Sequence, residues 1–129
     1  MCRLYEANKL TGPFVASGAT LQVKESNGSI RSWGDARAKQ AWKKPMAVMV
    51  NRYSASASEI FAGAIQDYQR GIIIGQRTFG KGTVQKLDSL SSGQLKVTES
   101  KFYRVSGSGM QNKGIEPDIV LPSSWDIEE

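Results

Sequence analysis

The sequence contains no histidine, and this absence excludes several kinds of active site. A Ser-His-Asp triad, a Cys-His pair and most zinc sites each need an imidazole from the chain. A nucleophile in this sequence must therefore be activated by another base, and lysine is the main candidate.

Cysteine and long apolar segments are also scarce. Cys2 is the only cysteine, so no disulfide can form within the chain. No apolar run is long enough to span a membrane, and residues 1–6 lack the apolar core of a signal peptide. If the natural protein is exported, its export signal lies outside this sequence.

The composition is that of a globular domain. Hydrophobic residues make up 40% and charged residues 22% of the 129 positions, so the whole chain is not expected to be disordered. The net charge is +5, but the basic residues are scattered and form no stripe with aromatic residues. A solvated basic surface is therefore favoured over a nucleic-acid interface.

The hydrophobic pattern predicts a mixed α/β fold. Asn27-Gly28 between two alternating segments predicts a hairpin, and a strand–helix–strand pattern over residues 46–75 predicts a buried parallel sheet. Gly71 is expected to stop the helix of that unit. The predicted elements are helices over 4–10 and 59–70, strands over 20–24, 29–33, 46–50, 72–74, 83–87, 94–105 and 119–121, and a loop or short helix over 35–44.

A run of small residues, from Ser54 to Glu59, lies at the predicted junction between strand and helix. A serine there meets the N-terminus of the helix, whose backbone N–H groups can stabilise a developing oxyanion. Ser56 and Glu59 also fit the S-x-x-E capping box. Because helix caps are far commoner than nucleophiles, this motif by itself favours a cap.

The segment from Gly75 to Gly82 nearly matches the phosphate-binding loop G-x-x-x-x-G-K-S/T. Gly82 stands where that loop needs a hydroxyl, and residues 83–85 look like a strand rather than the start of a helix. Nucleotide binding is therefore an unfavoured alternative.

Lys81, between two glycines, can serve as a base instead. Burial of a lysine amine disfavours its charged form, which makes a neutral amine available for proton transfer. In an extended segment Lys81 and Gln85 point the same way, so the Gln85 amide can orient the amine. The commoner alternatives are a solvent-exposed loop lysine and a polar residue on a half-exposed strand.

Taken together, these motifs resemble the tail-specific, or carboxyl-terminal processing, proteases. The resemblance runs from about residue 4 to residue 122 and is closest to bacterial periplasmic members. It is carried by residues 50–62, 75–85, 101–104 and 111–119. It implies an α/β fold with a parallel-sheet core of the crotonase and Clp protease type and an antiparallel β portion. It also implies a periplasmic serine endopeptidase that needs no metal or organic cofactor and cuts proteins near apolar, unstructured C-termini.

The resemblance also implies a set of site residues. The family nucleophile precedes the lysine by 25 residues, which selects Ser56 rather than either neighbouring serine. Lys81 matches the general base, Gln85 the glutamine that orients it, and the Ala57 N–H an oxyanion donor. Asp67 matches an aspartate that supports activity in some members, but its place late in the helix predicts a structural role.

Two family features do not occur in the sequence. One is the peptide-binding PDZ domain, and the other is an upstream strand ending in Asp-Leu-Arg-x-Asn-x-Gly-Gly, which supplies the second oxyanion donor. We therefore expect residues 1–129 to be the C-terminal part of a protease catalytic domain. Since one lost oxyanion donor costs about a hundredfold in rate, weak or no activity is expected of the isolated chain. An exposed sheet edge would also favour self-association.

Two alternatives to an enzyme remain. A protein with this fold can bind peptides in its substrate groove without cleaving them. The segment from Gly75 to Gly82 and the positive charge can instead bind a nucleotide or a nucleic acid.

Overall fold

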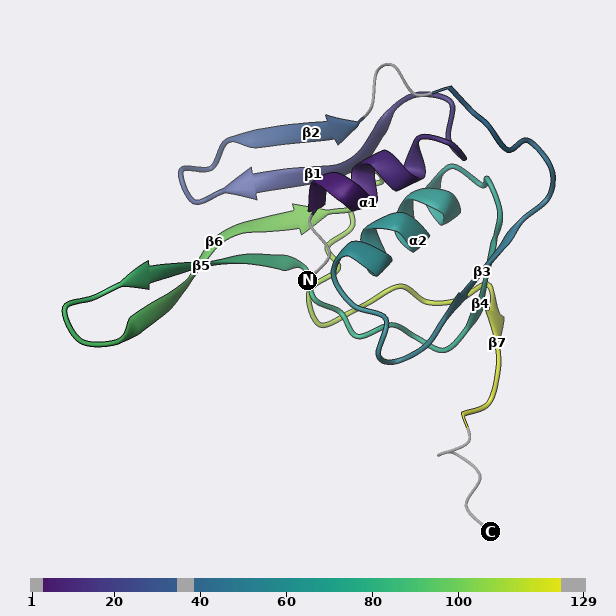
Figure 1. The fold of residues 1–129 in the computed structure, drawn as a ribbon. Helices are drawn as coiled ribbons and strands as arrows, with labels where there is room; N and C mark the ends of the chain where they lie inside the picture. Colours follow the sequence, from purple (N-terminus) through teal and green to yellow (C-terminus); the bar gives the residue numbers. More distant parts are fainter. Residues whose placement is uncertain (1–3, 35–38, 124–129) are drawn as a thin grey trace, which may run out of the picture.

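The computed structural model describes residues 4–34 and 39–123, in which two helices and seven strands occur (Figure 1). Residues 35–38 of the predicted loop or short helix lie outside the described residues, and residues 39–44 form no helix or strand. The elements are α1 (Leu4–Thr11), β1 (Ala19–Glu25), β2 (Ile30–Gly34), β3 (Ala47–Val50), α2 (Ala57–Asp67), β4 (Ile72–Gly75), β5 (Thr83–Ser89), β6 (Gln94–Tyr103) and β7 (Ile119–Val120). None of the described helices is long and apolar enough to cross a bilayer.

An antiparallel sheet has the strand order β2-β1-β6-β5. The predicted hairpin at Asn27-Gly28 joins β1 to β2, and the Glu25 N–H donates to the Ser29 carbonyl at 2.9 Å across the turn. The β5–β6 hairpin extends away from the helices (Figure 1). The strands predicted over residues 83–87 and 94–105 are therefore confirmed, and they form an antiparallel pair.

A parallel sheet has the strand order β3-β4-β7. The strand–helix–strand prediction is confirmed, because β3 and β4 pair in parallel and are joined through α2. Ile73 of β4 is fully buried, but Met49 of β3 is 79% exposed. The prediction of a buried strand is thus wrong for β3, which lies at the sheet edge with its outer face uncovered by any described element.

Helix α2 packs between the two sheets, where it contacts α1, β1 and β4 (Figure 1). Its apolar residues Ile60, Ala64 and Ile65 are buried. The helix begins two residues earlier than predicted and ends at Asp67. Gln69 adopts a left-handed φ of 50° after the helix end, so the expected stop at Gly71 is not what ends the helix.

An ion pair connects α2 to the segment after β6. Arg104 donates from Nη2 and Nε to the two carboxylate oxygens of Asp67, at 2.5 Å and 3.2 Å, and the Ser106 N–H donates to the same carboxylate at 3.3 Å. The Asp67 and Arg104 side chains are only 10% and 17% exposed. This bidentate geometry supports the structural role expected for Asp67.

We predict that Asp67→Ala lowers the free energy of unfolding by about 3 kcal/mol, because the Arg104 cation loses its partner in a mostly buried position. Chemical denaturation of the purified chain measures this effect. Asp88→Ala is the matched control, because Asp88 pairs with Lys86 on the exposed hairpin and should leave the midpoint nearly unchanged. Equal shifts in the two variants would contradict the prediction.

Candidate active site

Ser56 lies at the turn between β3 and α2 in a strained backbone conformation. Its φ of 58° falls in the left-handed region, which a residue with a side chain adopts at a cost of about 1–3 kcal/mol. A sharp turn of this kind between a strand and a helix exposes the side chain at the sheet edge. The structure therefore places Ser56 at the carboxyl end of a parallel strand, where sites in α/β folds form.

A fully buried carboxylate, that of Glu59, connects this turn to the loop of residues 78–82 that carries Lys81, the lysine loop. Its Oε2 accepts the N–H of Ser56 at 2.7 Å and the N–H of Lys81 at 2.9 Å. Its Oε1 accepts the Thr78 hydroxyl and the Gly80 N–H, both at 2.6 Å. The backbone nitrogens of Ser56 and Lys81 are therefore less than about 6 Å apart, since both bind one oxygen.

The two glycines beside Lys81 permit this loop conformation. Gly80 has a φ of 87°, and a Cβ at Gly82 would come within 2.7 Å of the Gln111 nitrogen. The Gly82 N–H also donates to the Gln111 side-chain oxygen at 2.8 Å. The Gly80 and Lys81 N–H groups are already bound to a carboxylate, which argues against a phosphate cradle here.

A pocket of about 730 Å³ contains all three predicted catalytic side chains. Ser56 and Lys81 are both half-buried and line it together with Gln85 of β5. Its other lining residues are Leu4, Tyr5, Trp33, Thr83, Val84, Leu87, Lys96 and Phe102. Elements far apart in the sequence thus bring the predicted nucleophile, base and orienting amide to one cavity.

The side chains of this trio are not hydrogen-bonded to one another within the described residues. Gln85 donates from Nε2 to the Thr98 hydroxyl at 2.9 Å, across the β5–β6 pair. Its carbonyl oxygen is the atom that can accept a hydrogen bond from a lysine amine. Lys81 is therefore held near Ser56 through its backbone rather than through its amine.

The predicted oxyanion donor, the Ala57 N–H, is the first backbone donor of α2. The first N–H groups of a helix have no acceptor within the helix, and the positive end of the helix dipole lies there. No hydrogen bond among the described residues uses this N–H. It is therefore available to a ligand beside Ser56.

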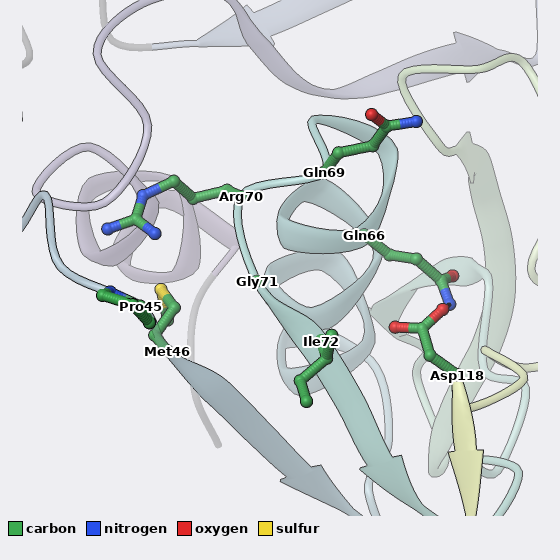
Figure 2. Close-up of a pocket in the computed structure, with 8 residues that line it drawn as sticks. All are labelled: Pro45, Met46, Gln66, Gln69, Arg70, Gly71, Ile72 and Asp118. Carbon is green, nitrogen blue, oxygen red and sulfur yellow. Dashed lines mark hydrogen bonds between the residues drawn. The ribbon is translucent and has the colours of Figure 1, made fainter.

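A second pocket, of about 460 Å³, lies at the opposite, amino-terminal edge of the parallel strands (Figure 2). The polar side chains of Gln66, Arg70 and Asp118 in its lining are already hydrogen-bonded. Gln66 donates to Asp118 at 2.7 Å, and the other Asp118 oxygen accepts the Ile73 N–H at 2.6 Å. Arg70 points away from this pair in Figure 2 and donates to backbone carbonyls, including that of Phe14 at 2.9 Å. These contacts hold strand starts in place.

Comparison with known proteins identifies the family of this chain. The sequence profile of Peptidase family S41 matches residues 3–121. The tail-specific protease of Haemophilus influenzae is 50% identical over 135 residues, covering 98% of this chain and 19% of that protein. The carboxy-terminal-processing protease of Bartonella bacilliformis is 50% identical over 80 residues, covering 61% of this chain and 18% of that protein. A solved photosystem II D1 C-terminal processing protease superposes with a TM-score of 0.79 at 35% identity, over 92% of this chain and 31% of that one.

The mixed parallel and antiparallel α/β architecture thus resembles that of a solved C-terminal processing protease. The chain belongs to Peptidase family S41. The family resemblance predicted from the motifs is confirmed. The chain spans 19% of the Haemophilus influenzae relative and 18% of the Bartonella bacilliformis relative.

The sequence interpretation missed the second function of Glu59. The S-x-x-E spacing predicted its bond to the Ser56 N–H, but its bonds to Thr78, Gly80 and Lys81 depend on tertiary packing. The available signal was the residue type itself, because a glutamate in a helix next to a buried strand needs several donors.

We predict that Glu59→Ala destabilises the chain by about 3–5 kcal/mol, because it leaves several buried donors without an acceptor. Urea unfolding measures the loss. Glu59→Gln is the matched variant: it keeps the shape but turns an NH₂ group toward N–H donors, so an intermediate loss is expected. Unfolding midpoints equal to that of the unsubstituted chain would show that the network is unimportant.

Proposed function

We propose that this chain is the part of a serine endopeptidase catalytic domain that carries the nucleophile and the base. The observation that carries the proposal is the single pocket lined by Ser56, Lys81 and Gln85. The bonds from the Ser56 and Lys81 backbones to one Glu59 oxygen support it. Membership of a peptidase family gives the reaction class.

The proposed reaction has two half-reactions. The Ser56 hydroxyl attacks the scissile carbonyl while the neutral Lys81 amine takes its proton, and the Ala57 N–H binds the developing oxyanion. Lys81 then gives the proton to the leaving amine, and an ester remains on Ser56. In the second half, Lys81 deprotonates a water molecule, which attacks the ester and releases the acid and the free serine. Gln85 orients the amine through its carbonyl oxygen.

The proposed substrates are proteins with apolar, unstructured C-terminal segments. The pocket walls support this choice, because most of its lining besides the catalytic trio is aliphatic or aromatic. We further propose that the core is of the crotonase and Clp protease type and that residues 1–129 form the C-terminal part of a catalytic domain in a longer, periplasmic protein. Relatives several times longer than this chain support the last point.

Peptide binding without cleavage is the second candidate. The lack of a hydrogen bond from the Lys81 amine to Ser56 or Gln85 among the described residues favours it. The two candidates share the pocket and differ in whether Ser56 forms a covalent acyl intermediate.

Ser56→Ala and Lys81→Ala are each expected to lower peptide hydrolysis by about a thousandfold or more. The first substitution removes the nucleophile and the second removes the general base. The assay is cleavage of a fluorogenic peptide with an apolar C-terminus by the longer protein proposed to contain this chain. Ser58→Ala and Lys86→Ala are the controls, since neither residue lines the pocket, and they should retain nearly full activity. Binding without any Ser56-dependent turnover would favour the second candidate.

The exposed edge strand β3 supports the proposal that the isolated chain self-associates. Light scattering after size exclusion should give a mass that rises with concentration. Met49→Lys should suppress this rise, because a charge on an exposed edge strand opposes pairing. Leu90→Lys, at a residue 55% exposed on the distant β5–β6 turn, should not. A constant monomer mass, or equal effects of both variants, would contradict the proposal.

A further inference from the structure

One side of the β5–β6 hairpin continues the candidate active-site pocket. Gln85 stands directly opposite Thr98, and Leu87 directly opposite Lys96, so these two pairs share a face of the hairpin. Gln85, Leu87 and Lys96 all line the pocket. The cavity therefore runs from Ser56 and Lys81 outward along this face.

The charge in the pocket is of one sign. Its lining includes the basic residues Lys81 and Lys96 and no carboxylate. Within the described part of the chain Lys96 makes no ion pair. By contrast Lys86, on the other face of the hairpin, lies 2.9 Å from Asp88, whose hydrogen bond and charge raise the pKa of Lys86. Of these two lysines, Lys86 has its charge matched by Asp88, whereas Lys96 faces the pocket and makes no ion pair among the described residues.

Strand β5 is also the edge of its sheet, so its outer backbone groups face no described strand. An extended peptide can pair with such an edge while its alternate side chains enter neighbouring pockets. A strand advances about 3.3 Å per residue, so the Leu87–Lys96 pair lies about 7 Å beyond the Gln85–Thr98 pair. A group that binds there is therefore about two residues farther along an extended peptide than a group beside Gln85.

We propose that Lys96 is a specificity-determining residue that binds a carboxylate of the substrate, about two residues beyond the substrate position beside Gln85, while Leu87 packs against an apolar neighbour. This inference rests on the proposed function, since it places the substrate along the pocket of Ser56 and Lys81. The carboxylate can belong to an aspartate or glutamate side chain or to the end of the substrate chain.

Peptide binding to the Ser56→Ala chain tests this without turnover. The probes are fluorescent peptides of alanine, valine and leucine that contain one variable residue. In a first series, with an amidated C-terminus, that residue is a glutamate placed at successive positions. Two further amidated peptides contain a glutamine or a lysine instead, and a last peptide contains the glutamine and has a free C-terminus. The Ser56→Ala chain with Lys96 intact should bind a carboxylate-bearing peptide more tightly than the neutral peptide. The glutamate series and the free-acid peptide distinguish the two sources of the carboxylate.

Lys96→Gln in that background should weaken the carboxylate-bearing peptide by about three- to fivefold and leave the neutral peptide unchanged. Lys96→Glu should reverse the preference toward the lysine peptide. Lys86→Gln is the matched control, one register position away on the opposite face, and should change neither affinity. The difference should shrink in high salt.

Several results would overturn the proposal: no preference of the Lys96 chain for any carboxylate-bearing peptide, equal losses for charged and neutral peptides, or equal effects of Lys96→Gln and Lys86→Gln. The outcome is separable from that of the proposed function. Charge-selective binding at Lys96 with no Ser56-dependent hydrolysis would reject only the peptidase, whereas Ser56-dependent hydrolysis without charge selectivity would reject only the role of Lys96.

Discussion

The buried carboxylate of Glu59 receives hydrogen bonds from both segments that carry the candidate catalytic residues. Each of its oxygens accepts two hydrogen bonds, and three of the four donors are backbone N–H groups. A carboxylate without exposed surface is stable only with such full satisfaction, because burial of an unpaired charge is very costly. The same bonds offset the strain of the positive φ at Ser56. The start of helix α2 and the lysine loop are therefore held together as one unit.

Thr78 extends this unit to a third segment of the chain. Its hydroxyl donates to Glu59 and accepts the Ile115 N–H at 2.7 Å, and both Thr78 and Ile115 are buried. The Asn112 N–H also donates to the Gly80 carbonyl, at 2.8 Å. Segments near positions 59, 80 and 113 consequently meet at one point. A change in any of them reaches the site through this buried hydrogen-bond network rather than through side chains in the pocket.

The sequence predicted local features well where one interaction decides them. Asn27-Gly28 determines its hairpin, and the spacing of Ser56 and Glu59 determines one bond of the cap. The sequence-based prediction was wrong where tertiary packing determines the outcome. The β3 run is as apolar as a buried strand, yet Met49 is exposed because no described element covers that face of the parallel sheet, where Ile72 of the central strand is also 45% exposed. The helix ends where Gln69 rather than a glycine turns the chain. The pocket role of Lys96 depends on the register with β5, which alternation alone does not specify.

In the candidate site the backbone is fixed, whereas the catalytic side chains are not yet hydrogen-bonded to one another in the part of the chain that the structure describes. Backbone positions at Ser56 and Lys81 are fixed by a buried network, whereas the Lys81 amine has no hydrogen bond to Ser56 or Gln85 within the described residues. Catalytic hydrogen bonds often tighten only when substrate fills a site, because the substrate excludes the water that competes for them. A peptide along β5 would cover the pocket from the hairpin side, next to Gln85 and Thr98. The hairpin would then serve both as the surface that selects the substrate and as the wall that completes the site.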